Sequence, residues 1–156
     1  MVLTDLNLGT VKTEDEDEEE TEGASAEHVR RDAVYKLLFE VQSTSSWFSG
    51  IDPEENGILE EFVKILRAPR GAYLITAGSR PSYLGIIAKG FLDVYSEGRK
   101  VTYLGYGEMI GEMTLLTQRA SALELRAGKD GVTLLTIQRL DFRKIFDRCP
   151  ALGLKL

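Results

Sequence analysis

The fold is decided by the stretch YLGIIAKGFLDVYSEGRKVTYL, residues 83–104. It contains three short runs rich in branched and aromatic residues, at 83–88, 91–96 and 101–104. Lys89-Gly90 and Glu97-Gly98 separate these runs. Short apolar runs separated by glycine-containing turns are typical of consecutive antiparallel strands. We therefore expect the middle of the chain to form β-hairpins.

The same pattern continues on both sides of this stretch. Further β-prone runs lie at 72–76, 122–126 and 132–138. Turn signals stand between the runs, at Gly78-Ser-Arg-Pro81 and at Gly128-Lys-Asp-Gly131. Short strands at this spacing, about six to eight of them, predict a small antiparallel barrel or jelly roll over residues 65–138.

Helical periodicity precedes the strands. A helix over 28–42 is predicted by apolar residues at helical spacing, namely Val34, Leu37, Leu38 and Val41. Asp52-Pro53-Glu54-Glu55 signals the start of a second helix, because it combines a capping acid, an early proline and acids that suit the helix dipole. The buried stripe expected for that helix is Ile58, Leu59, Phe62, Val63 and Leu66. Trp47, between the two helices, is expected to anchor their packing.

Helical spacing returns after the strands, where Phe142, Ile145 and Phe146 predict a C-terminal helix within 139–156 that Pro150 interrupts. The predicted class is α+β: an antiparallel β jelly-roll barrel flanked by N-terminal helices and a short C-terminal helix. The domain would run from 28 to 156, with its helices at 28–66, its barrel at 65–138 and its last helix at 139–156.

Charge is distributed unevenly along the chain. The formal net charge is −6, yet residues 1–30 alone carry ten acids against two bases, a net of −8. Seven consecutive acids stand at positions 14–20. Such a block repels itself and has little apolar surface to bury, so we expect residues 1–27 to be a disordered acidic tail. An electrostatic tether or decoy for a basic partner is the alternative role for this segment.

Composition excludes several classes of function. No apolar run approaches the roughly 18 residues of a membrane span, and the N-terminus lacks the pattern of a signal peptide. A single cysteine, Cys149, excludes an internal disulfide, and a single histidine, His28, excludes a histidine-based metal cluster or catalytic triad within the domain. A jelly-roll metalloenzyme is rejected for the same reason. We expect a cytoplasmic protein that is not an enzyme and that holds no metal and no cofactor.

The candidate binding segment is GEMIGEMTLLTQRASALELRA, residues 107–127. Gly111-Glu112 opens a short apolar helical turn, and Arg119 follows it. Unpaired N–H groups at a helix start favour an anion, and an arginine fork can bind phosphate oxygens with two parallel hydrogen bonds. Glu112 would repel phosphate but can accept a hydrogen bond from a sugar hydroxyl. The segment therefore suits a small cyclic sugar-phosphate; a loop with a surface ion pair is the alternative.

The order of these motifs resembles the cyclic nucleotide-binding domain family, which includes the catabolite activator protein and regulatory subunits of cyclic AMP-dependent kinase. The resemblance covers residues 34–156. It rests on the spacing of Gly71, Gly78 and Gly90, on the run that ends at Gly90, and on 107–116 followed by 119–123, which is similar to the family's phosphate-binding cassette. The segment that begins at Arg139 is similar to the helix after the family's barrel.

This resemblance implies roles for the residues of the cassette. Glu112 would accept a hydrogen bond from the ribose 2′-hydroxyl, and Arg119 would pair with the cyclic phosphate. Backbone N–H groups of Met113, Thr114 and Ala120 would complete the anion pocket, and Gly111 would allow close approach of the sugar-phosphate. A hydroxyl residue directly after the arginine favours cyclic GMP in this family. Since that position is Ala120, cyclic AMP is the expected ligand unless Ser121 takes over the contact.

Two departures from the family's pattern shape the expectation. Arg119 comes seven residues after Glu112, against nine or more in the family, and the chain ends six residues beyond Pro150 where relatives continue into a long lid helix. The leading function is a regulatory module that binds a cyclic nucleotide and signals to an effector through its C-terminal helix. The alternative is a non-binding scaffold of the same fold, in which Glu112 and Arg119 pair with each other. Direct binding of nucleic acid is not expected, and a homodimer stays open.

Overall fold

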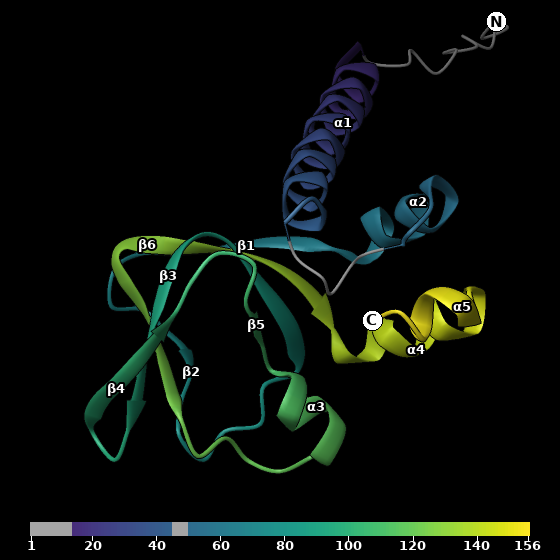
Figure 1. The fold of residues 1–156 in the computed structure, drawn as a ribbon. Helices are drawn as coiled ribbons and strands as arrows, with labels where there is room; N and C mark the ends of the chain where they lie inside the picture. Colours follow the sequence, from purple (N-terminus) through teal and green to yellow (C-terminus); the bar gives the residue numbers. More distant parts are fainter. Residues whose placement is uncertain (1–13, 45–49) are drawn as a thin grey trace, which may run out of the picture. The chain divides into compact units, whose positions relative to one another are not determined.

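The computed structural model describes residues 14–44 and 50–156 (Figure 1). Residues 1–13 of the acidic tail, and Trp47 with the rest of 45–49, lie outside the described residues. The chain divides into two units, Met1–Asp32 and Ala33–Leu156. The second unit holds the strands and the candidate site.

The first helix, α1 (Glu14–Gln42), begins earlier than predicted, so residues 14–27, which we expected to be disordered, are helical. Glutamate and alanine are good helix formers, and acids near the start of a helix interact favourably with its dipole, which offsets part of their mutual repulsion. Within the second unit, Val34, Leu38 and Val41 of α1 are buried. The apolar stripe predicted for this helix is therefore confirmed there.

The second helix, α2 (Pro53–Phe62), starts where the sequence predicts. The Asp52 carboxylate accepts a hydrogen bond from the Glu55 amide at 2.9 Å, and the Glu55 carboxylate accepts one from the Asp52 amide at 2.9 Å. This reciprocal capping box satisfies two donors at the start of the helix. The helix ends sooner than expected, because Val63 is already extended and Leu66 lies in the first strand.

Six strands of the described part of the chain form one antiparallel sheet (Figure 1). They are β1 (Lys64–Ala68), β2 (Tyr73–Ile75), β3 (Tyr83–Ser96), β4 (Arg99–Leu104), β5 (Met109–Ile110) and β6 (Glu124–Gln138). The main order is β1-β6-β3-β4, while β2 pairs with β6 and β5 with β3. The sheet is jelly-roll-like but, contrary to the predicted barrel, it is not closed.

Two predicted turns turn out to be irregularities inside long strands. Lys89-Gly90 lies within β3, which shows register shifts on both sides of it, and Gly128–Gly131 lies within β6. Gly90 has a φ of +78°, and a Cβ added there would stand 2.3 Å from the carbonyl oxygen of Gly131. The glycine thus allows two strands to approach closely instead of reversing the chain. The turn at Glu97-Gly98 is confirmed, with φ of 49° and 77°.

The last two helices are α4 (Arg139–Arg148) and α5 (Pro150–Gly153), separated at Cys149. Ile145 and Leu152 are fully buried among residues of α1, α2 and the outer face of the sheet. A second apolar cluster, which includes Ile87, Leu92 and Leu134, fills the inside of the curved sheet. The helices therefore cover one face of the sheet, and the candidate cassette closes part of the other.

Candidate nucleotide site

A cavity of about 220 Å³ opens inside the sheet next to the short helix α3 (Glu112–Thr117). Apolar side chains of β2, β3, β4 and β6 form much of its wall, among them Ile75, Val94, Leu104 and Leu125. The other wall comes from the segment Met109–Thr114, with Ser121 and Leu123. The cassette predicted from the sequence therefore does border a cavity.

Gly111 turns the chain from β5 into α3. Its φ is +86°, a backbone conformation that residues with a side chain rarely adopt. A Cβ added at this position would stand 2.3 Å from the carbonyl oxygen of Tyr83. Close approach of a sugar-phosphate to Gly111 stays a prediction, and in this structure the neighbour that requires a glycine is β3. Tyr83 itself donates its hydroxyl to the Leu74 carbonyl at 3.0 Å, and burial raises the pKa of this phenol.

Glu112 carries the most informative polar atom of the cavity. Its side chain borders the cavity, and its Oε2 is buried without a hydrogen-bond partner among the residues that the structure describes. A buried carboxylate oxygen without a donor costs more free energy than a buried neutral acceptor, and native proteins leave few such groups unsatisfied. The position therefore suits a ligand that brings a hydroxyl donor.

The residues after Glu112 present backbone as well as side chains. Thr114 is buried, whereas Met113 is 65% exposed, so Met113 meets the cavity mainly through its position in the first turn of α3. Helical geometry leaves the first N–H groups of a helix without an acceptor in the same helix. Both residues can therefore turn amide donors towards an anion, as the sequence suggests.

Arg119 and Ala120 lie elsewhere. Both are exposed, and neither borders the cavity. Before Arg119, α3 runs to Thr117, and Gln118 takes a left-handed conformation with a φ of 57°. The Arg119 amide donates to the Thr117 hydroxyl at 3.3 Å. Within residues 50–156 Glu112 and Arg119 form no ion pair. The alternative interpretation of this segment, a loop with a surface ion pair between these two residues, therefore finds no support.

Ser121 is held at the cavity by its own neighbours. Its hydroxyl donates to the Leu123 carbonyl at 2.8 Å and accepts from the Leu123 amide at 3.2 Å. Its amide donates to the Ser79 carbonyl, and its carbonyl accepts from the Gly78 amide.

Thr102 of β4 also borders the cavity, and the sequence analysis did not predict it. It pairs with Val94 of β3. Side chains along a strand point alternately to the two faces of the sheet, and this alternation is the sequence signal that could have placed Thr102 on the inner face.

The described residues also bear on two other kinds of site, a metal centre and a membrane-spanning helix. No group of three or more histidine, cysteine, aspartate or glutamate side chains within them is placed to hold a metal ion. No described helix is both long enough and apolar enough to cross a membrane. The cavity beside α3 therefore offers a carboxylate that can accept a hydrogen bond from a hydroxyl group, backbone amide donors at the start of α3, and apolar walls.

Two curated proteins are similar to part of this chain in sequence. The chain is 29% identical over 98 residues to a cAMP-dependent protein kinase regulatory subunit of Eremothecium gossypii, which covers 63% of this chain and 21% of that protein. It is 32% identical over 95 residues to a cGMP-dependent protein kinase of Plasmodium berghei, which covers 61% of this chain and 11% of that protein. The chain thus spans about a fifth or less of these curated relatives.

The structure is also similar to the crystal structure of the Thermus thermophilus Catabolite Activator Protein. The TM-score is 0.61 and the sequence identity 27%, covering 71% of this chain and 54% of that one. A model of the cyclic nucleotide-binding domain matches residues 65–149, which is more than half of the chain. The resemblance inferred from the glycine spacing and the cassette is confirmed, and the chain belongs to the cyclic nucleotide-binding domain family.

Proposed function

We propose that this domain binds a cyclic nucleotide in the cavity beside α3 and uses the bound ligand to regulate an effector. The observation that carries the proposal is the buried, unpartnered Oε2 of Glu112 at the wall of that cavity. A ribose hydroxyl supplies the donor that this oxygen lacks. The role is regulatory and not catalytic, and it requires no metal.

The size of the cavity fits a partly enclosed ligand. At about 220 Å³ it is smaller than the roughly 300–1,000 Å³ of sites that enclose a whole organic ligand. The sugar and phosphate would enter it, next to the amides of Met113 and Thr114, while the base would stay near the entrance. The apolar walls exclude water, which strengthens the few polar contacts that remain.

Arg119 has to act from outside the cavity. Its guanidinium is exposed, and within the described residues no acceptor holds it. A phosphate at the amides of α3 would attract it, and the long side chain can then fold over the entrance. Binding would thus order this side chain, at a cost in conformational entropy that reduces the affinity.

Cyclic AMP is the proposed ligand. One relative is named for cyclic AMP and another for cyclic GMP, so family membership alone leaves the base open. Ala120 offers no hydroxyl to the guanine amino group, and the hydroxyl of Ser121 is already engaged with Leu123. Both observations favour adenine.

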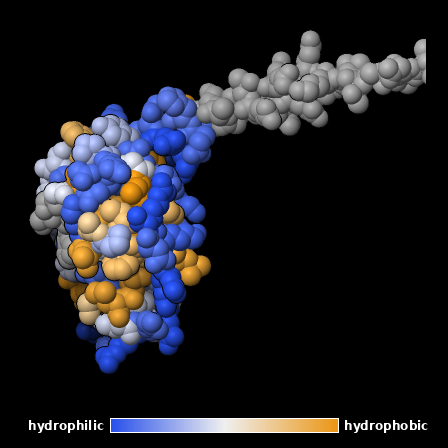
Figure 2. Space-filling view, turned by 90° about the vertical axis from the view of Figure 1, so that its right-hand side faces the viewer, coloured by the Kyte–Doolittle hydropathy of each residue, from blue (hydrophilic) through white to orange (hydrophobic). Residues whose placement is uncertain are grey.

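The signal would leave through α4 and α5. Figure 2 shows hydrophobic groups between hydrophilic ones on the side of the molecule that carries these helices in Figure 1. Apolar residues of this segment remain open to solvent: 80% of Leu140, 46% of Phe146 and 80% of Leu154 is exposed. A ligand that favours one position of these helices shifts the population by no more than its difference in affinity for the two states.

A second candidate function is a non-binding scaffold of the same fold, and the position of Arg119 outside the cavity favours it. Calorimetric titration with cyclic AMP and cyclic GMP at modest salt separates the two. The binding proposal expects saturable heat with a one-to-one stoichiometry and tighter binding of cyclic AMP. Absence of heat with both nucleotides, in protein that is folded by circular dichroism, would establish the scaffold reading.

A further inference from the structure

A second cavity, of about 790 Å³, shares no lining residue with the first. Strands β1, β6 and β3 border it, together with Leu37 of α1. Two cations stand in its wall, Arg67 and Lys89. The proposed nucleotide function uses none of these residues.

The two cations stand in one row across three strands. Arg67 of β1 pairs with Thr133 of β6, and Lys89 of β3 pairs with the same threonine. Directly paired residues of antiparallel strands project to the same face, and neighbouring strands lie about 4.8 Å apart. Arg67 and Lys89 therefore flank the Thr133 side chain, with Cα atoms roughly 10 Å apart.

This row extends the face that the helices cover. Two residues earlier in β1, Ile65 pairs with Leu135, which pairs with Ile86, and all three belong to the cluster under the helices. Since side chains on one face of a strand recur every second residue, Arg67 and Thr133 lie on that same face. On this face, the apolar residues under the helices are therefore followed by a polar row, formed by Arg67, Thr133 and Lys89.

A β-bulge brings Lys89 to this face. The register of β3 against β6 shifts between Ile87 and Lys89. Regular alternation from the buried Ile87 would place Ala88 on the helix face and Lys89 towards the inside of the sheet. The extra residue restores Lys89 to the row of Thr133, and bulges of this kind re-aim side chains. The irregularity keeps a charge out of the core and turns it towards the cavity.

Neither cation has a partner in the structure. Arg67 and Lys89 are exposed, and within residues 14–44 and 50–156 no hydrogen bond or ion pair engages their charged groups. Asp130 borders the same cavity but forms no ion pair with either. Two like charges that face one cavity repel each other, and an anion between them relieves that repulsion.

We propose that this second cavity, formed around Arg67, Lys89 and Thr133, binds a phosphorylated small organic molecule. An arginine fork, a lysine ammonium and a hydroxyl supply donors for a tetrahedral oxyanion. The rest of the wall includes the apolar residues Leu37 and Pro69, and the organic part of the ligand would lie against them. The volume lies within the roughly 300–1,000 Å³ of sites for organic ligands.

The test follows backbone amides by ¹H–¹⁵N NMR during titration with phenyl phosphate, which joins an oxyanion to an apolar ring. We expect saturable shifts at Gly90, Gly131 and Thr133, and weaker binding of inorganic phosphate to the same amides. Arg67→Ala and Lys89→Ala should each weaken phenyl phosphate binding by at least about tenfold, the loss expected for one charged hydrogen-bonding partner. Lys64→Ala removes a positive charge from the same strand at a residue that does not line the cavity, and it should leave the affinity for phenyl phosphate unchanged.

Each outcome decides the proposal. Absence of saturable shifts at these amides, or unchanged affinity in both variants, would overturn the site. Equal affinity for inorganic phosphate and phenyl phosphate would overturn the assignment of an organic ligand. Shifts confined to Gly111 and Thr114 would place the probe in the first cavity and also contradict the proposal. The result is independent of the proposed nucleotide function, because Glu112→Gln should leave the shifts of the second cavity unchanged.

Discussion

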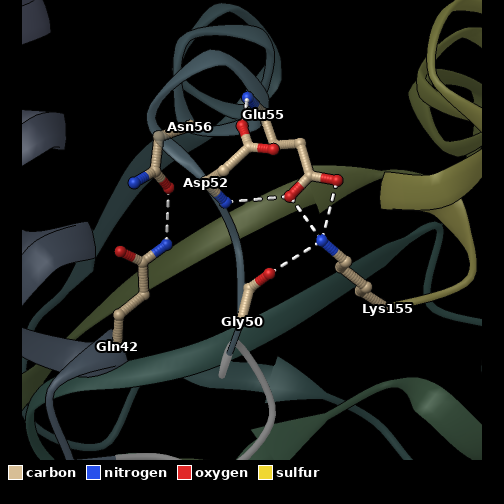
Figure 3. A network of polar contacts seen from close by, with 6 residues as sticks. All are labelled: Gln42, Gly50, Asp52, Glu55, Asn56 and Lys155. Atoms are coloured by element: carbon tan, nitrogen blue, oxygen red, sulfur yellow. Dashed lines mark hydrogen bonds and ion pairs between the residues drawn. The ribbon is translucent and has the colours of Figure 1, made fainter.

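Lys155 binds the carboxylate of Glu55, with its Nζ 2.6 Å from Oε2 and 2.8 Å from Oε1 (Figure 3). The same ammonium donates to the Gly50 carbonyl at 2.7 Å, and Glu55 also caps α2 through the Asp52 amide. Only 7% of the Glu55 side chain is exposed. One buried carboxylate thus ties the end of the chain to the start of α2, and any movement of the segment after α5 has to break this contact.

The Glu55–Lys155 pair should make stability depend on pH. The hydrogen bond from Lys155, followed by that from the Asp52 amide, lowers the pKa of Glu55 below its ordinary value of 4.5. A lowered folded-state pKa means that the stabilisation is complete above the unfolded pKa and is lost as the pH falls through the folded one. Urea unfolding of wild type and Glu55→Gln should therefore differ most near neutral pH, and the difference should shrink in acid.

Glu54→Gln is the matched control for this pair, because Glu54 is an exposed neighbour in the same helical turn. It should show a much smaller difference from wild type. A Glu55→Gln difference that stays constant from neutral to strongly acid pH would contradict the contribution assigned to the pair.

Gly111→Ala should destabilise the domain and abolish nucleotide binding. A side chain at a φ of +86° is strained, and the added Cβ would stand 2.3 Å from the Tyr83 carbonyl oxygen. A strained backbone position of this kind costs about 1–3 kcal/mol in the free energy of unfolding. Gly57→Ala is the control, because nothing lies within 4 Å of an added Cβ there and the residue sits inside α2. We expect Gly57→Ala to stabilise the fold by about 0.4–1 kcal/mol, and a destabilisation of equal size in both variants would contradict the account.

Arg119→Ala should weaken binding of cyclic AMP without affecting the fold. The side chain is exposed, so its loss leaves the core intact. If it folds over the phosphate, removing it costs at least about 1.5 kcal/mol, or roughly tenfold in affinity. Calorimetry on Arg119→Ala and on Arg99→Ala, which removes an exposed arginine from β4, measures the difference. Equal affinities in these two variants would show that Arg119 does not reach the ligand.

Base selectivity should depend on position 120. The methyl group of Ala120 leaves the guanine amino group without a partner, at a cost of about 1–3 kcal/mol if no water reaches it. Cyclic AMP should bind more tightly than cyclic GMP, and Ala120→Thr should narrow or reverse that preference. A wild-type preference for cyclic GMP that disappears in Ser121→Ala would show that the serine hydroxyl leaves Leu123 to bind the base.

Local signals predicted much of the fold. The capping acids at Asp52 and Glu55, the helical spacing of Val34 and Leu38, and the turn at Glu97-Gly98 are all properties of neighbouring residues, and the structure bears them out. The predicted turn at Gly90 is wrong, because a positive φ suits both a turn and a close approach of two strands, and Gly90 lies inside β3. The sequence does not distinguish these two uses.

Contacts between residues far apart in the sequence could not be predicted in the same way. Glu55 and Lys155 are separated by 100 residues, and nothing near either one predicts the other. For the site, the segment Gly111–Thr114 borders a cavity, and its role in binding stays a prediction. The position of Arg119 depends on how α3 ends at Gln118, and a left-handed conformation in a residue other than glycine has no clear sequence signal.

The central claim is that Oε2 of Glu112 binds a ribose hydroxyl, and a thermodynamic cycle tests it most directly. Cyclic AMP and its 2′-deoxy analogue are titrated into wild type, Glu112→Gln and the exposed-turn control Glu97→Gln. Removing the hydroxyl should weaken binding to wild type and to Glu97→Gln by at least about tenfold, as expected for a hydrogen bond to a charged group. In Glu112→Gln the two ligands should bind with nearly equal affinity, because the two losses are not additive. The same penalty for the deoxy analogue in all three proteins would contradict the claim.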